Sequence, residues 1–209
     1  ELRLMGLLAD QAAVAISNAS LHKGVTELAN TDSMTGLPNR RALDERLQDE
    51  MRYARSMNSK FSVVMMDLDG FKNVNDTLGH GIGDDVLRHV FNYLAEKMRA
   101  TDFLARYGGD ELTLIMRDSD MEVAGIVTNK IIELMKAYSY PIPGSIPIQL
   151  GLTAGIAVYP LHSHIASDLL RAADAALYRA KKHNRGKFVV AKAGTGPLDS
   201  LSFSISKKD

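Results

Sequence analysis

The chain has 209 residues, 45% of them apolar, which is enough for one folded domain with a sizeable core and an appendage. Its 25 Lys and Arg side chains balance 25 Asp and Glu side chains, so no overall basic field favours binding to long nucleic acid. The absence of cysteine excludes disulfides and thiolate metal sites, which leaves oxygen and imidazole groups as metal ligands.

The first thirty residues carry a helical pattern. Leu7, Val14, Leu21 and Leu28 recur every seven residues, which predicts a stalk helix over residues 1–30. Such a helix is about 40 Å long, too long to pack wholly on a small domain. It fits a parallel coiled coil that relays a signal, the last helix of an upstream domain, or both. Because the pattern is already under way at Glu1, we expect a piece cut from a longer protein.

A break and a strand follow this helix. Residues 31–41 are rich in capping and turn residues, and Asn39 can cap a helix that runs to about Met57. The apolar run at residues 61–66 predicts a strand, which ends in Asp67 and Asp69. Residues 70–80 are polar, with one Phe.

The remaining pattern predicts a mixed order of helices and strands. In chain order we expect a helix at 83–99, a hairpin of strands 102–107 and 112–116, a helix at 121–137, strands at 146–150 and 152–159, a helix at 167–183 and a strand at 187–191. One α/β (α+β) domain over residues 31–192 accounts for this order. Residues 193–209, rich in Gly, Ser and Lys, predict a flexible tail.

Nothing in the sequence predicts a membrane segment. No run reaches the roughly 18 to 20 apolar residues of a membrane span, and the beginning of the chain lacks a signal-peptide pattern. We therefore expect a cytoplasmic protein.

Carboxylates stand at two predicted strand ends. Asp67 ends one strand, and Asp110 with Glu111 follows the Gly-Gly turn of the hairpin. Two acidic strand ends suggest one divalent metal site of oxygen ligands, as phosphoryl or nucleotidyl transfer requires. A solvated turn is the better interpretation of Asp110 and Glu111 in isolation, but the second acidic strand end argues against it. No Gly-x4-Gly-Lys-Ser/Thr motif is present, which disfavours a P-loop enzyme.

Together these motifs resemble one family. The runs Arg106-Tyr-Gly-Gly-Asp-Glu-Leu112, Asp67-Leu-Asp69 and Thr35-Gly-Leu-Pro-Asn-Arg40 are similar to those of GGDEF-domain diguanylate cyclases, over about residues 32–190. The resemblance implies a central, mainly antiparallel sheet flanked by helices, like the nucleotidyl cyclase and polymerase palm folds. It also implies synthesis of cyclic di-GMP and pyrophosphate from two GTP, with Mg²⁺ or Mn²⁺ as cofactor and a homodimer as the active unit.

The resemblance implies the metal ligands and the catalytic groups. Asp67, the Leu68 carbonyl, Asp110 and Glu111 match the metal ligands of the family. Asp110, Glu111 and Lys72 are the expected catalytic residues, with Asp110 contacting the metal or helping to deprotonate the attacking 3′-hydroxyl.

The resemblance also implies how guanine is recognised. Guanine needs an acceptor for its N1 and N2 hydrogens and a donor for O6, and Asp84 and Asn75 occupy the matching positions. Helix capping is the alternative role for both. Phe71 and Lys72 are expected to close the loop over the nucleotide.

The triphosphate has its own expected partners. Gly108 and Gly109 carry no side chains that would block its approach, and they tolerate positive φ. Lys181 and Arg185 match the basic residues with which the family grips the triphosphate.

Other positions concern regulation and packing. Arg99 and Asp102 match the Arg-x-x-Asp inhibitory motif that binds cyclic di-GMP as product, and Lys130 is the nearest candidate for the family's additional Arg. Leu112 stands where the family commonly has Phe, and we expect it to point into the core. His162 is interpreted as a loop residue rather than a metal ligand.

Two functions of another class stay open. The chain can be a catalytically inactive effector that binds cyclic di-GMP, or a dimerisation relay without a ligand. The intact carboxylates favour the enzyme.

Overall fold

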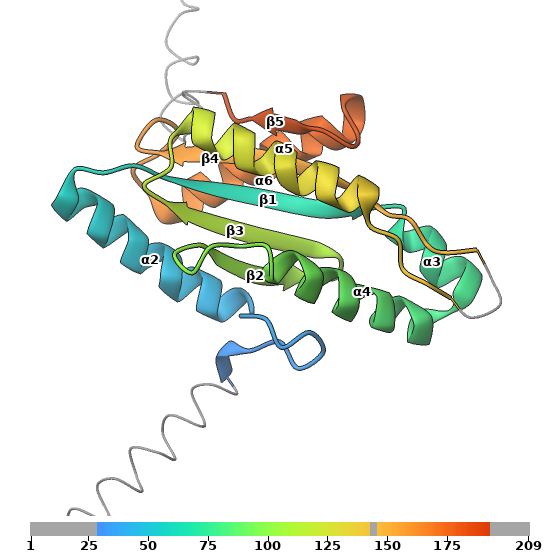
Figure 1. Cartoon of the computed structure of the whole chain (residues 1–209). Coiled ribbons are helices and arrows are strands. Elements are labelled where there is room, and N and C mark those ends of the chain that lie inside the picture. The colour runs from blue at the N-terminus through green and yellow to red at the C-terminus, as the bar shows by residue number, and fades with distance from the viewer. Residues whose placement is uncertain (1–28, 143–145, 193–209) are drawn as a thin grey trace, which may run out of the picture.

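The computed structural model describes residues 29–142 and 146–192, where a five-stranded sheet is covered by helices (Figure 1). The predicted tail lies outside these residues, as does the predicted stalk apart from Ala29 and Asn30, which are helical. The described elements in chain order are α2 (Arg40–Met57), β1 (Phe61–Asp69), α3 (Phe71–Leu78), α4 (His80–Ala95), β2 (Phe103–Gly108), β3 (Glu111–Arg117), α5 (Met121–Ala137), β4 (Gly151–Tyr159), α6 (Ala166–His183) and β5 (Phe188–Val190). None of the helices in these ranges is long and apolar enough to cross a membrane.

The sheet has the strand order β2-β3-β1-β4-β5. All neighbouring strands are antiparallel except β4 and β5, which are parallel and are connected in the chain by α6. The prediction of a central, mainly antiparallel sheet flanked by helices is therefore confirmed. The β2–β3 hairpin also forms as expected, with its turn at Gly109 and Asp110.

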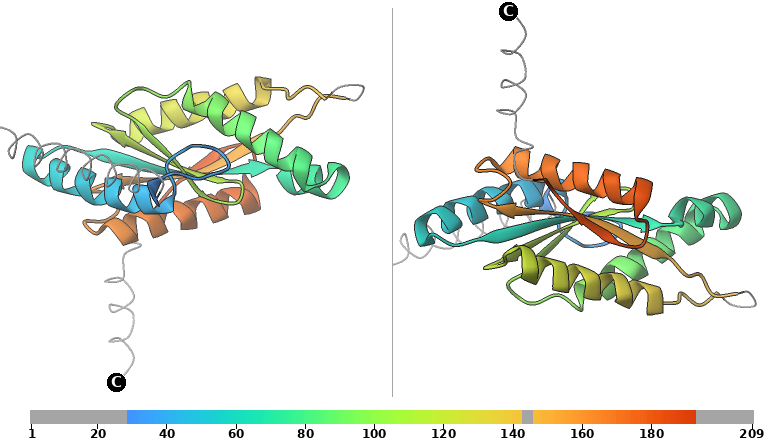
Figure 2. Two further views of the ribbon diagram at one scale, coloured as in Figure 1. Left: turned by 90° about the horizontal axis from the view of Figure 1, so that it is seen from below. Right: turned by 90° about the horizontal axis from the view of Figure 1, so that it is seen from above.

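Each face of the sheet carries its own hydrophobic core. Figure 2 shows α4 and α5 on one side of the sheet and α2 and α6 on the other. Along β1, Val64 and Met66 belong to the core beneath α4 and α5, whereas Val63 and Met65 belong to the core beneath α2 and α6. Because both faces are covered, β1 is a continuous apolar run rather than an alternating one.

Helix α6 approaches β4 closely at Gly155. A Cβ atom at this position would lie 2.2 Å from the Ala173 carbonyl oxygen and 2.2 Å from the Leu177 backbone nitrogen. Only glycine leaves room for this contact between a helix backbone and a strand. The close approach fixes α6 over the strands that carry the acidic residues.

Helix α3 lies in the polar segment after β1, for which the sequence pattern predicts no element. It has eight residues, and only Phe71 and Val74 are buried, so the segment is too short and too polar to show a helical period. Gly79, at φ +83°, separates α3 from α4. Helix α4 begins at His80 and ends at Ala95, earlier at both ends than predicted.

The predicted strand at residues 146–150 is wrong. This segment forms a single antiparallel bridge, in which Tyr140 and Ile148 exchange two backbone hydrogen bonds of 2.9 Å. Pro141 and Pro147, each beside a bridge residue, lack the N–H groups that a longer ladder requires.

Two polar residues hold the ends of elements in place. Asn39 caps α2 by accepting a hydrogen bond from the Ala42 backbone at 3.1 Å, as the sequence predicts. His162 is 5% exposed and links two backbone segments. Its Nδ1 accepts from the Val158 N–H at 2.8 Å, and its Nε2 lies 2.9 Å from the Ala191 carbonyl oxygen. His162 thus joins the end of β4 to the segment after β5.

Candidate active site

The two predicted acidic strand ends lie side by side. Asp67 on β1 is the direct antiparallel partner of Glu111 on β3. On its other side Asp67 is the partner of Thr153 on β4. Directly opposed residues of an antiparallel pair project from the same face, with Cβ atoms roughly 5 Å apart. The three side chains therefore share the face that α6 covers.

The hairpin turn leaves open space beside these acids. Gly109 has φ +54°, a conformation that suits glycine. A Cβ atom at Gly108 or Gly109 would meet no heavy atom of the described residues within 4 Å. Neither close packing nor a positive φ therefore requires glycine at position 108. The open side of the turn is compatible with a bound phosphate chain.

A clamp that sequence reasoning missed holds this turn. Arg106 donates to the Gly109 carbonyl through Nε at 3.0 Å and through Nη2 at 2.8 Å. Its Nη1 lies 3.0 Å from both carboxylate oxygens of Asp32, which also accepts from the backbone and hydroxyl of Thr35. The segment that precedes α2 is therefore tied directly to the acidic turn. The Asp and Arg were visible in the sequence, but nothing in it pairs two residues 74 positions apart.

The clamp makes Asp32 a stronger acid. Burial alone would raise the pKa of Asp32, but the hydrogen bonds from Thr35 and Arg106 together outweigh burial and hold the pKa below its ordinary value. Asp32 is therefore ionised at neutral pH and keeps Arg106 in place.

Asp67 and Glu111 are shifted in the opposite direction. Burial is the main cause that raises the pKa of Asp67, and the charges of Asp110 and Asp69 add to it. Burial followed by the charge of Asp67 raises the pKa of Glu111. Lys181 opposes both shifts, with its Nζ 2.5 Å from an Asp67 oxygen. One ammonium group thus faces several carboxylates, and further positive charge would be favourable here.

A divalent cation fits this donor set, with a limit on ligand number. In the described part of the chain, no three His, Asp or Glu side chains converge as a metal centre. The opposed pair of Asp67 and Glu111 can supply two carboxylates. Mg²⁺ is commonly bound by one or two carboxylates, substrate phosphates and waters, so a two-carboxylate site suits a cation that arrives with a nucleotide.

Helices α3 and α4 bring the expected guanine-reading residues close together. Asn75 packs against Gly83, where an added Cβ would lie 1.9 Å from the Asn75 amide oxygen. Asp84 is the next residue on α4 and is exposed. Gly83 thus leaves room for the Asn75 side chain beside Asp84.

Phe71 and Lys72 lie on a helix rather than on a closing loop. Phe71 is 7% exposed and belongs to the core beneath α4 and α5, whereas Lys72 is exposed at the start of α3. The Phe71 ring packs in this core, and its contact with the nucleotide remains a prediction. Lys72 remains available to a ligand.

The basic pair lies at the end of α6. The helix ends at His183, so Arg185 follows it in a turn rather than on a continued helical face. Its Nε nevertheless donates to the Lys181 carbonyl at 3.3 Å. Lys181 lies next to β1, where Asp67 engages its ammonium group in this state.

The predicted inhibitory pair forms a turn between α4 and β2. The Asp102 carboxylate accepts from the Arg99 backbone N–H at 3.1 Å, and the Asp102 N–H donates to the Arg99 carbonyl at 3.0 Å. Arg99 is exposed, as is Lys130 on α5. Leu112 is 1% exposed in the core beneath α4 and α5, where the sequence placed it.

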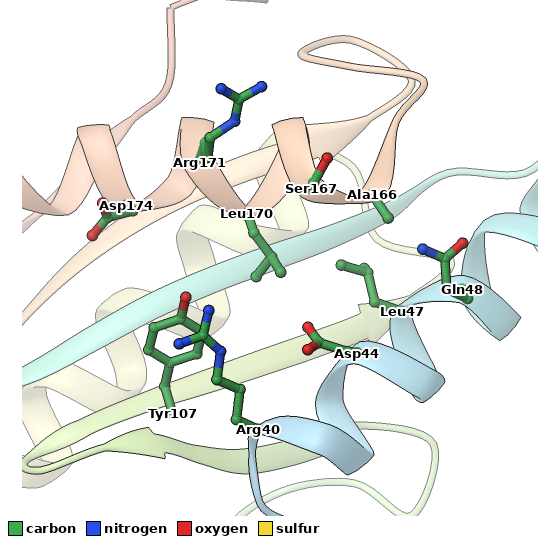
Figure 3. A pocket seen from close by; sticks show the side chains of 10 residues that line it. All are labelled: Arg40, Asp44, Leu47, Gln48, Tyr107, Ala166, Ser167, Leu170, Arg171 and Asp174. Carbon is green, nitrogen blue, oxygen red and sulfur yellow. The ribbon is translucent and has the colours of Figure 1, made fainter.

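A separate cavity of about 470 Å³ lies between α2, the end of β2 and α6 (Figure 3). The Arg40 guanidinium lies over the Tyr107 ring at 4.7 Å on one side of it. None of the predicted site residues lines this cavity. Its lining consists of Arg40, Asp44, Leu47, Gln48, Tyr107, Ala166, Ser167, Leu170, Arg171 and Asp174.

A palm-like sheet with paired carboxylates beside a Gly-Gly turn defines a nucleotidyl cyclase type of domain. The family model described as "Diguanylate cyclase, GGDEF domain" matches residues 29–187. The chain therefore belongs to the GGDEF diguanylate cyclase family.

Known relatives and structures agree with this assignment. MucR, a bifunctional diguanylate cyclase and cyclic di-GMP phosphodiesterase of Pseudomonas aeruginosa, is 37% identical over 183 residues, 87% of this chain and 26% of that protein. The diguanylate cyclase TpbB of the same species is 38% identical over 178 residues, 84% of this chain and 40% of that protein. The coiled coil and GGDEF domain of DgcB from Caulobacter crescentus, solved with cyclic di-GMP, gives a TM-score of 0.79 at 28% identity, covering 90% of this chain and 99% of that one. The chain thus spans less than half the length of these two curated relatives.

Proposed function

We propose that this chain is the catalytic domain of a diguanylate cyclase, which condenses two GTP into cyclic di-GMP and two pyrophosphates. The observation that carries the proposal is the antiparallel pairing of Asp67 with Glu111 beside the open Gly108-Gly109 turn. The names of MucR and TpbB, both diguanylate cyclases, support the same activity.

The reaction forms two phosphodiester bonds. In each step the 3′-oxygen of one GTP attacks the α-phosphorus of the other, and the bond from that phosphorus to the bridging oxygen breaks to release pyrophosphate. Asp110, in the turn, would accept the proton of the 3′-hydroxyl. Lys181, Arg185 and Lys72 balance the charge of the triphosphate and of the departing pyrophosphate.

The cofactor we propose is Mg²⁺, with Mn²⁺ able to replace it. Asp67 and Glu111 would hold the cation, with the Leu68 carbonyl and Asp110 as further oxygen donors. When bound, it would neutralise phosphate charge and polarise the α-phosphate. Burial of both carboxylates and the charge of Asp67 beside Glu111 support this role, because both carboxylates gain from a nearby cation.

Recognition of guanine falls to Asn75 and Asp84. Gly83 seats the Asn75 amide next to Asp84, so an amide and a carboxylate are presented from adjacent helices. An Asp acceptor for N1–H and N2–H favours guanine over adenine, which offers an acceptor at N1.

Two copies of the chain are required, because each holds one GTP. Cyclic di-GMP has two equivalent phosphodiester bonds, so two loaded domains facing each other across a two-fold axis make both. We further propose that product binds Arg99 and Asp102 and inhibits the enzyme. The complex of DgcB with cyclic di-GMP supports a product-binding surface in this family.

Incubation with GTP and Mg²⁺, followed by mass spectrometry of the products, tests the proposal. Cyclic di-GMP that forms with Mg²⁺ and not with EDTA supports a metal-dependent cyclase. Unchanged GTP together with tight binding of added cyclic di-GMP would instead indicate an effector domain. Unchanged GTP and no binding would leave a dimerisation relay.

A further inference from the structure

Thr153 on β4 is buried at the centre of a short polar chain. It is 0% exposed and lies opposite Asp67 in the sheet. Its hydroxyl donates to an Asp69 carboxylate oxygen at 2.5 Å and accepts from the Gly186 backbone N–H at 2.9 Å. The acidic end of β1 is therefore linked through one hydroxyl group to the turn that follows α6.

That turn carries Arg185, one of the two basic residues of the site. Gly186 directly follows Arg185 and has φ +72°. The Lys187 N–H donates to the Asn184 carbonyl at 3.1 Å, which closes the turn. The Lys187 carbonyl in turn accepts from the Ala154 N–H at 3.1 Å, next to Thr153. The position of the turn relative to β1 thus depends on contacts with two consecutive residues of β4.

The chemistry of this link requires a hydroxyl. A carboxylate only accepts hydrogen bonds, and a backbone N–H only donates them. The group between Asp69 and Gly186 must therefore donate on one side and accept on the other. Serine satisfies both demands, whereas the isosteric valine satisfies neither.

A second buried threonine differs from Thr153 in that its hydroxyl group makes no hydrogen bond. Thr128 on α5 is also 0% exposed, and within the described residues its hydroxyl has no hydrogen-bond partner. The fold thus tolerates a buried threonine without using its oxygen. At Thr153 both hydrogen-bonding capacities are used, and both partners lie next to residues of the site.

We propose that Thr153 is a positioning residue for the triphosphate, which sets the place of Arg185 relative to the acidic end of β1. The proposal rests on GTP being the substrate. Loss of the hydroxyl releases the turn after α6 and leaves an unpartnered amide and carboxylate. Arg185 then meets the β- and γ-phosphates less often in the binding geometry, while guanine recognition on α3 and α4 stays intact.

Calorimetric titration with GTP and with GMP, in the presence of Ca²⁺ to slow turnover, tests this role separately from catalysis. For Thr153→Val we expect GTP affinity to fall roughly fivefold to twentyfold, the equivalent of one or two lost hydrogen bonds, with GMP affinity unchanged. Thr153→Ser should restore GTP affinity, and Thr128→Val should behave as wild type. If Thr153→Val folds poorly, Thr153→Ala carries the same comparison.

Three results would overturn the proposal. They are wild-type GTP affinity in Thr153→Val, an equal loss of GTP and GMP affinity, or no rescue by serine. Wild-type protein that binds neither nucleotide would contradict the proposed substrate instead, so the two failures are distinguishable.

Discussion

Arg106 donates two hydrogen bonds to the carbonyl of Gly109, at 3.0 Å and 2.8 Å, and so closes the hairpin turn from inside. The same guanidinium contacts Asp32, which precedes α2. Movement of the chain that enters the domain can therefore reach Asp110 and Glu111 through one side chain. The clamp connects the segment that precedes α2 to the site through a side-chain contact.

Replacement of Arg106 by Met should impair catalysis more than folding. The turn loses its two hydrogen bonds, and a misplacement of about 1 Å near the chemistry can cost roughly a hundredfold in rate. We expect a tenfold to hundredfold fall in kcat, with about 1–3 kcal/mol lost from the free energy of unfolding. Steady-state kinetics and urea unfolding measure the two effects. Arg52→Met, which removes an exposed partner of Asp49 on α2, is the control and should change neither. A wild-type kcat in Arg106→Met would show that the contacts of Arg106 with Gly109 and Asp32 do not support catalysis.

The ionisation of Asp32 should make stability depend on pH. Its pKa is lowered in the folded protein, so the unfolded state binds the proton more readily. The stabilisation is therefore present above the unfolded pKa, near the ordinary value of 3.8, and is lost as pH falls through the lower folded pKa. We expect Asp32→Asn to be less stable than wild type at pH 7 and the difference to shrink below about pH 4. Urea unfolding at a series of pH values measures it, and a constant difference would contradict the assignment.

Gly155 should tolerate no side chain. In Gly155→Ala the new methyl group meets two backbone atoms of α6 at 2.2 Å, and α6 must move away from β4. We expect a loss of about 1–3 kcal/mol in the free energy of unfolding and weaker binding of GTP, because Lys181 moves with the helix. Gly81→Ala on α4 is the matched control: at this helical glycine no described atom lies within 4 Å of the added Cβ. That change should be neutral or stabilising by up to about 1 kcal/mol. Equal effects of the two substitutions would refute the close-packing argument.

Glu111→Gln should stabilise the metal-free protein. Burial and the charge of Asp67 raise the pKa of Glu111, so its ionised form at neutral pH costs folding free energy that the amide avoids. We expect a gain on the order of 1 kcal/mol in EDTA, typical of relief at a functional site. Thermal unfolding in EDTA measures it, with Glu96→Gln, an exposed position just after α4, as the control. A lower stability of Glu111→Gln would contradict the prediction, because it would mean that Lys181 stabilises the Glu111 carboxylate by more than burial and Asp67 destabilise it.

Local patterns predict those parts of the fold that interact with near neighbours. The boundaries of α5, the Asn39 cap and the hairpin at Gly109 all follow from periodicity and turn chemistry within a few residues. Helix α3 was missed because two buried residues in eight define no period. The apolar residues around Ile148 predict a strand where only a bridge forms, because the flanking prolines limit the ladder.

Some residues of the site follow from sequence motifs, whereas others are recognised only in the folded chain. Family motifs identify Asp67 and Glu111, and the register shows why they act together, since each is the cross-strand partner of the other. The Asp32–Arg106 pair and the Thr153 link join residues far apart in the sequence, so only the folded chain brings them together. The same holds for Gly155, whose need for glycine arises from a helix packed across the strand.

The central claim is that the paired carboxylates of Asp67 and Glu111 support cyclic di-GMP synthesis. Product formation from GTP and Mg²⁺ by wild type and Glu111→Gln, at equal dimer fraction and with folding checked by circular dichroism, tests it most directly. The account predicts cyclic di-GMP from wild type and none above background from the folded variant. Product formation by Glu111→Gln at the wild-type rate would contradict it.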